Sequence, residues 1–117
     1  AKRGACAYTD SMTTRLYTHP IYLEHLTPAG HPERPDRLRA IGKILEEPEF
    51  DDLDRKEAPM AEEGSILLAH PEEYYDRIRL RIPHEGIVRI DSDTTVSPKS
   101  WQAALAGIGG ALAAVDD

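Results

Sequence analysis

Residues 13–46, TTRLYTHPIYLEHLTPAGHPERPDRLRAIGKILE, combine the patterns of a strand, a loop and a helix. The β-branched and aromatic residues before Pro20 are typical of a short strand, and His, Pro and Gly fill the loop that follows. Pro35 suits the first turn of a helix because its missing N–H would have no intrahelical partner there. Apolar residues then recur at helical spacing, so the sequence predicts a helix over residues 35–46.

The middle of the chain continues the alternation of helices and strands. An acidic connection over residues 46–59 leads into a short edge strand. Residues 60–70 and 71–82 predict a short helix and a longer one, separated by Pro71. GIVRI, residues 86–90, has strand character, and DSDTTV, residues 91–96, has the polar composition of a loop.

The last helix is predicted to begin at Ser97, as an N-cap, with Pro98 in its first turn. One stripe of this helix is apolar, and Ala and Gly occupy most other positions, which predicts a buried helix with close neighbours. The stripe consists of Trp101, Leu105, Ile108, Leu112 and Val115. GIGG, residues 107–110, lies inside the helical pattern and lacks the Lys-Ser/Thr end of a phosphate loop, so close helix packing explains it better.

Alternating strands and helices predict an α/β fold with a mostly parallel sheet. Only two or three strands can be counted, too few for a finished sheet of that kind. The final helix also ends without a capping glycine and with two acidic residues at the end that prefers cations. These patterns favour the first part of a larger, truncated domain over residues 13–117, with residues 1–12 as an N-terminal extension or a cloning remnant.

Composition narrows the classes of partner. The net charge is -7 and the pI is near 5.2, which disfavours nucleic acid and anionic lipid as general partners. No apolar run approaches the roughly 20 residues of a membrane span. The single cysteine, Cys6, excludes an internal disulfide and favours a cytoplasmic location.

The five histidines raise the question of whether the chain binds a metal ion. His19, His25 and His31 are spaced six residues apart, which neither a strand nor a helix would place on one side. We therefore favour structural or loop-capping roles for them. His70 is interpreted as a cap or packing residue before a helix, and His84 as a surface loop residue.

Asp91 and Asp93 alternate in DSDTT, a spacing that in an extended loop would direct both carboxylates toward one partner. A turn in which they satisfy their own backbone, or cap the next helix, is equally compatible with the sequence. Neither has an evident acid or base partner, so turn formation and ligand binding both stay open.

Three stretches resemble the histone deacetylase superfamily, especially its class II, acetoin-utilisation and acetylpolyamine amidohydrolase branches. They are LYTHPIYLEHLTPAGHPERPDRLRAI (16–41), LLAHPEEYYDRI (67–78) and DSDTTVSPKSWQAALAGIGGAL (91–112). The resemblance implies the N-terminal part of an arginase-deacetylase-type three-layer α/β/α domain with a mostly parallel sheet. It also implies a zinc-dependent amidohydrolase acting on acetyl-lysine or acetylpolyamine. The family's zinc ligands and catalytic residues would lie downstream of this chain, so no catalytic or metal residue is assigned and no zinc is expected on it.

The resemblance carries two kinds of site residue onto this sequence. Arg37 matches an arginine of the internal channel behind the zinc, where it could attract acetate; pairing with Glu33 is the equally weighted alternative. Asp93 matches a substrate-rim position, with Asp91 as its substitute if the alignment shifts. His31 and Pro32 would border the pocket mouth.

The leading hypothesis is an N-terminal fragment of a zinc-dependent deacetylase, inactive alone, with self-association through an exposed sheet edge. The alternative is a small non-catalytic interaction module that docks through the charged helix around residues 71–81.

Overall fold

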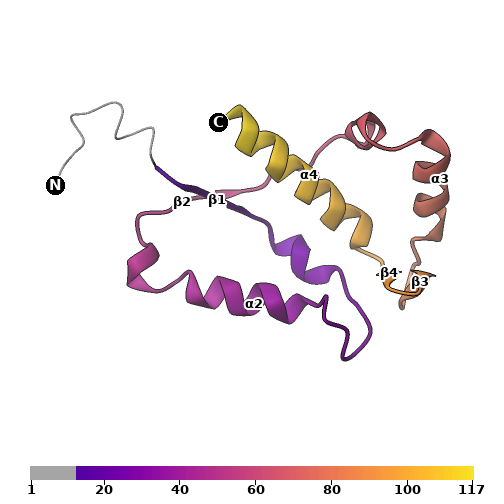
Figure 1. Ribbon diagram of the computed structural model, residues 1–117, viewed down its shortest axis with the longest axis horizontal. Helices are drawn as coiled ribbons and strands as arrows, with labels where there is room; N and C mark the ends of the chain where they lie inside the picture. Colours follow the sequence, from indigo (N-terminus) through magenta and orange to yellow (C-terminus); the bar gives the residue numbers. More distant parts are fainter. Residues whose placement is uncertain (1–12) are drawn as a thin grey trace.

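The computed structural model describes residues 13–117, so the N-terminal extension predicted over residues 1–12 lies outside the described residues. The described chain is elongated, with principal extents of 52 × 32 × 21 Å. Its radius of gyration is 17.4 Å, whereas a compact chain of this length has about 13 Å. The elements are therefore spread out around a small core (Figure 1).

A β-α-β unit forms one half of the molecule. Strand β1 (Arg15–Thr18) pairs in parallel with β2 (Asp54–Glu57). The 3-10 helix η2 (Pro20–Glu24), helix α2 (Pro35–Ile44) and the 3-10 helix η3 (Pro48–Phe50) connect the two strands. This mixed α/β arrangement and its parallel strand pair confirm the coarse fold class, and the acidic connection indeed contains a short strand.

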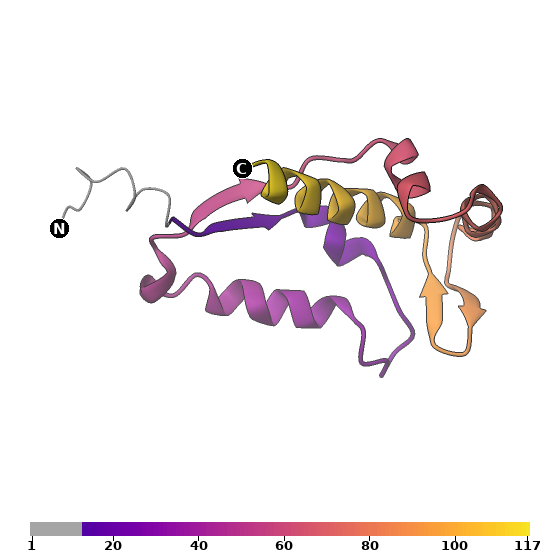
Figure 2. The ribbon, with the colours of Figure 1, turned by 45° about the horizontal axis from the view of Figure 1, so that its top comes forward.

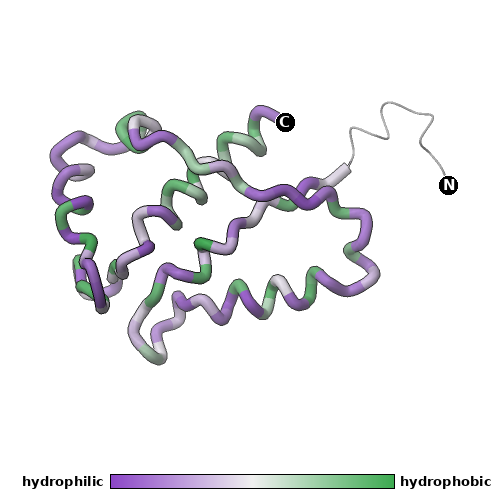
Figure 3. The backbone as a smooth tube through the Cα atoms, turned by 180° about the vertical axis from the view of Figure 1, so that it is seen from behind, coloured by the Kyte–Doolittle hydropathy of each residue, from purple (hydrophilic) through white to green (hydrophobic). Residues whose placement is uncertain are grey.

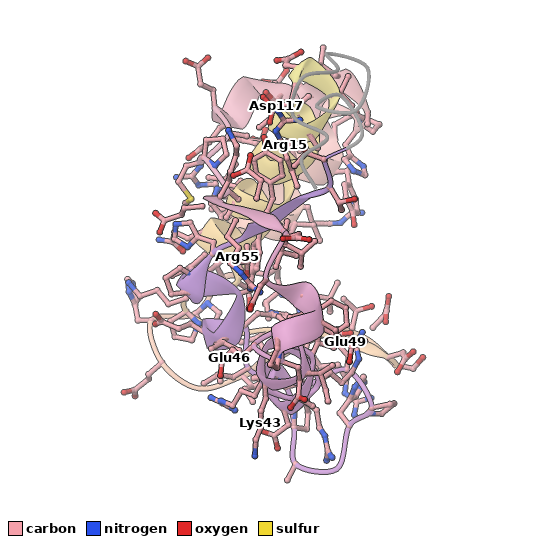
Figure 4. The ribbon with its side chains drawn as sticks, turned by 90° about the vertical axis from the view of Figure 1, so that its left-hand side faces the viewer. Arg15, Lys43, Glu46, Glu49, Arg55 and Asp117 are labelled. Atoms are coloured by element: carbon pink, nitrogen blue, oxygen red, sulfur yellow. The ribbon has the colours of Figure 1, made fainter. Side chains whose placement is uncertain are left out.

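Helix α2 begins at Pro35, as predicted, and ends at Ile44, two residues before the predicted end. Its C-terminal end is tied to the sheet by Arg55 of β2, whose guanidinium donates to the backbone carbonyls of Leu45 and, at 3.3 Å, Phe50. Figure 4 shows Arg55 reaching from the sheet toward α2. None of the ten α2 residues of the described chain is buried, so its apolar stripe is largely uncovered there.

The second half contains the 3-10 helix η4 (Glu63–Leu68) and helix α3 (Glu72–Arg81), where a short and a longer helix were predicted. Strands β3 (Val88–Asp91) and β4 (Thr94–Val96) follow as an antiparallel hairpin. The prediction of a loop throughout residues 91–96 was therefore wrong. Two β-branched threonines and a valine suit a strand once β3 offers a partner.

Helix α4 (Ser100–Asp116) begins three residues later than predicted. Ser97 does not cap the helix: its fully buried hydroxyl accepts from the Leu26 N–H at 2.8 Å and donates to the Glu24 carbonyl at 3.3 Å. The prediction of an N-cap at Ser97 was wrong because this hydroxyl bonds to the end of η2 instead.

The small residues of α4 pack against the segment that follows β2. A Cβ on Gly109 would lie 1.7 Å from the Pro59 carbonyl oxygen, and one on Gly110 would lie 3.1 Å from the Ala58 Cβ. The Ala61 N–H donates to the Leu105 carbonyl at 3.1 Å. This close approach confirms the packing interpretation of residues 107–110.

The apolar stripe of α4 is only partly covered. Leu105 is buried, but Leu112 and Val115 are exposed, so the prediction that the whole helix is buried was wrong for the described chain. In Figure 3 much of the middle of this helix is green, and its two ends are purple. The buried apolar residues of the described chain are few: Ala58, Val96, Leu105 and Ala106.

Candidate functional site

The loop before α2 and the β3–β4 hairpin lie next to each other (Figures 1 and 2). His31 in the loop and Asp93 in the hairpin turn are 62 residues apart in sequence, and His31 Nε2 lies 3.1 Å from Asp93 Oδ1. The fold therefore brings together two residues that were predicted for the substrate rim.

Hydrogen bonds within the loop orient the His31 ring. Its Nδ1 accepts from the Glu33 backbone N–H at 3.0 Å, so in the neutral ring the proton sits on Nε2 and is donated to Asp93. The His31 backbone N–H donates to the Pro28 carbonyl at 3.0 Å, and the Thr27 hydroxyl donates to the Glu33 carbonyl. Gly30, at φ +83°, supplies the left-handed turn before His31.

The two aspartates of the hairpin have different partners. Asp91 Oδ1 accepts from the Asp93 backbone N–H at 2.9 Å. This backbone hydrogen bond, helped by the Thr94 side chain, lowers the pKa of the Asp91 carboxyl below its ordinary value. Asp91 thus forms the turn that the sequence allowed, whereas the Asp93 side chain, 86% exposed, contacts His31. The two carboxylates do not face one partner.

Arg37 forms the ion pair that was the alternative to a channel role. Its Nη1 lies 2.9 Å from Glu33 Oε1, one helical turn away, and both side chains are about half exposed. A cavity of about 320 Å³ lies nearby, between η2, the start of α2 and α4. It is lined by Tyr22, His25, Glu33, Leu38, Ser100, Ala103, Ala104 and Gly107, without Arg37. The channel role stays a prediction.

A buried polar junction at the start of α4 was missed by sequence reasoning. His25 Nδ1 lies 2.6 Å from Ser100 Oγ, which also accepts from the Ser97 N–H at 2.7 Å. Further along α4, the Tyr22 hydroxyl donates to the Ala106 carbonyl at 2.9 Å, and burial raises the Tyr22 pKa. Only the helical spacing of Ser97 and Ser100 hinted at this junction. It joins η2 to α4 and gives His25 a structural role.

The other histidines also have the structural roles that were favoured. His19 caps η2 by accepting from the Ile21 N–H at 3.0 Å. The His70 ring packs on Tyr74, with 5.2 Å between centroids. His84 is exposed in a loop.

An apolar groove of about 310 Å³ lies between α3, β4 and α4. Its lining includes Ile66, Ile78 and Trp101. Thr95 Oγ1 and Trp101 Nε1 are buried without a hydrogen-bond partner among the described residues. This groove was not predicted from the sequence, because residues 91–96 were predicted as a loop.

The described residues do not fit a zinc site. Within residues 13–117, no group of three or more His, Cys, Asp or Glu side chains is arranged to hold a metal ion. Over the same residues, no helix combines the length and apolar character needed to cross a membrane.

The fold and the site define a mixed α/β protein in which a loop and a hairpin meet through a His–Asp contact. Residues 31–117 match the model of the histone deacetylase domain. The chain therefore belongs to the histone deacetylase family, which is zinc-dependent.

A solved structure agrees with this assignment. The chain is similar to the crystal structure of the HDA15 HD domain, with 25% sequence identity and a TM-score of 0.66. The similarity covers 83% of this chain and 29% of that chain, so the chain corresponds to part of such a domain. No curated protein matches the sequence.

Proposed function

We propose that this chain supplies part of the substrate rim of a zinc-dependent deacetylase that acts on acetyl-lysine or acetylpolyamine. The observation that carries the proposal is the contact between His31 and Asp93, because both residues lie within the segment that matches the family. The family assignment also favours this function over that of a non-catalytic interaction module.

Asp93 is proposed as the group that accepts hydrogen bonds from the substrate amide or amine. Its exposed carboxylate suits a cationic or N–H-bearing ligand. Asp91 shapes the turn that presents Asp93, and His31 and Pro32 border the mouth of the pocket. Arg37 keeps its proposed channel role, which requires that its guanidinium exchange Glu33 for acetate.

The wider proposal is a three-layer α/β/α domain in which the β1–β2 pair belongs to a larger, mostly parallel sheet. Zinc would then be bound by residues outside the described chain, since the described residues do not fit a site for it. We further propose a cytoplasmic location. We also propose that the isolated chain self-associates through the exposed edges of the β1–β2 sheet.

The test is an acetate-release assay on the product of the complete natural reading frame. It uses an acetyl-lysine peptide and an N-acetylpolyamine, each with and without a zinc chelator. We expect chelator-sensitive release of acetate from at least one substrate, and none from the 117-residue chain supplied with zinc.

Two variants test whether the proposed rim residue contributes to this activity. Asp93→Asn should raise KM for the acetylated substrate, and Asp76→Asn, at an exposed position of α3, should not. Absence of acetate release by the complete, zinc-loaded protein would overturn the proposal and favour the interaction module.

A further inference from the structure

We propose that His31 is the positioning residue of the rim carboxylate. It holds Asp93 Oδ1 and leaves Oδ2 for a hydrogen-bond donor or cationic amine of the substrate. This inference rests on the proposed function, because it takes Asp93 as a substrate-binding group. It adds a residue that acts through Asp93 and does not itself touch the reacting atoms.

His31 is suited to this role because its ring is held from behind. Nδ1 accepts from the Glu33 N–H, and this bond would be lost if the ring rotated. The side chain is only 19% exposed. Because the ring is fixed, its Nε2–H points in one direction. Asp93 Oδ1 lies in that direction, 3.1 Å from Nε2.

Asp93 needs such a partner because its neighbours fix only its backbone. The bond from its N–H to Asp91 Oδ1 sets the turn but leaves the Asp93 side chain free to change rotamer. A carboxylate that samples several rotamers must be ordered when a ligand binds, and that ordering weakens binding. The His31 contact orders it beforehand.

The other carboxylates near His31 and Asp93 have partners of their own. Glu33 is turned toward Arg37, which neutralises its carboxylate at 2.9 Å. Asp91 is engaged by the Asp93 N–H and lies in the same strand as Arg89, whose charge also lowers the Asp91 pKa. Asp93, whose side chain is 86% exposed against 56% for Glu33, is therefore the more accessible of these two carboxylates to a ligand.

The first test measures the Asp93 side chain directly in this chain. Three-bond Hα–Hβ couplings report whether its χ1 angle occupies one rotamer or averages over several. We expect one rotamer in the wild-type chain, averaging in His31→Ala, and one rotamer again in His31→Gln, whose amide keeps an N–H donor. The couplings of Asp76 serve as the control and should not change. Averaging in the wild type, or one rotamer in His31→Ala, would overturn the positioning role.

The second test uses the complete enzyme and separates KM from kcat. His31→Ala should raise KM for an acetyl-lysine peptide about three- to tenfold, with kcat within about twofold, and His31→Gln should restore KM. Asp93→Ala should raise KM at least as much, and the double variant should add nothing further.

The two failures are distinguishable. An active enzyme whose KM is unmoved by His31→Ala would overturn this inference and leave the proposed function standing. A complete protein inactive on both substrate classes would overturn the proposed function, and the rim role of His31 with it, whatever the Asp93 rotamer.

Discussion

Helices α4 and α2 both carry an apolar stripe, yet they are held in opposite ways. Helix α4 presses its glycines against backbone, so that a Gly109 Cβ would overlap the Pro59 carbonyl. Helix α2 lies apart from the sheet (Figure 2) and exposes 49% of Ile41 and 57% of Ile44. The close contact of α4 thus lies at its glycines, whereas a Cβ on Gly42 of α2 would meet nothing within 4 Å.

The difference has a physical cause. A glycine face lets the helix axis approach a neighbouring chain closely, so hydrogen bonds such as Tyr22 to the Ala106 carbonyl can form across the contact. Helix α2 exposes its apolar side chains Leu38, Ile41 and Ile44, and it contacts η2 and, near its C-terminal end, Arg55. The same chain therefore contains one helix with a closely packed glycine face and another whose apolar stripe is open.

The largest expected effect comes from closing the glycine contact. Gly109→Ala should destabilise the chain by about 3 kcal/mol, because the added methyl meets backbone that cannot rotate away. Urea unfolding followed by circular dichroism measures the change. The matched control is Gly107→Ala on the open side of α4, where nothing lies within 4 Å. It should stabilise by about 0.8–1 kcal/mol through helix propensity. If both variants are stabilised, α4 does not approach Pro59 in solution.

An intermediate effect is expected at the start of α4. Ser97→Ala removes a fully buried hydroxyl and leaves the Leu26 N–H without its partner in a partly buried contact, which should cost about 1–3 kcal/mol. Ser92→Ala, at an exposed turn position, is the control and should change stability by less than about 0.5 kcal/mol. Equal stabilities of the two variants would show that the junction between η2 and α4 contributes little, and the contrast between the helices would then rest on the glycines alone.

Local structure could be predicted where a single residue type has a strong physical preference for one structural position. Pro35 marked the start of α2, and the glycines of residues 107–110 marked close packing. Strand β4 could not be predicted, because two threonines and a valine become a strand only when β3 lies beside them. Ser97 was misassigned for a similar reason: its hydroxyl bonds to η2, a partner far away in sequence.

At the candidate site, too, the local contacts could be predicted and the long-range contacts could not. The resemblance named His31 and Asp93, but no local pattern could bring together residues 62 positions apart. The turn formed by Asp91 was readable because its partner is two residues away. Contacts within a few residues follow from sequence, whereas the pairing of the loop with the hairpin depends on the whole path of the chain.

The smallest effect is expected on α2, and it tests the other side of the comparison. Ile41→Ala removes a half-exposed side chain, so it should cost less than about 1 kcal/mol, partly offset by the better helix propensity of Ala. Leu105→Ala, at a buried position of α4, is the matched reference and should cost about 2–5 kcal/mol in the same urea titration. An Ile41→Ala cost that reaches the Leu105→Ala value would mean that the apolar stripe of α2 is covered in solution. In that case the contrast between the closely packed face of α4 and the open stripe of α2 would be wrong. A small cost would instead show that Ile41 adds little to the stability of the chain and would leave the Arg55 bonds to the Leu45 and Phe50 carbonyls as the contacts that hold the C-terminal end of α2.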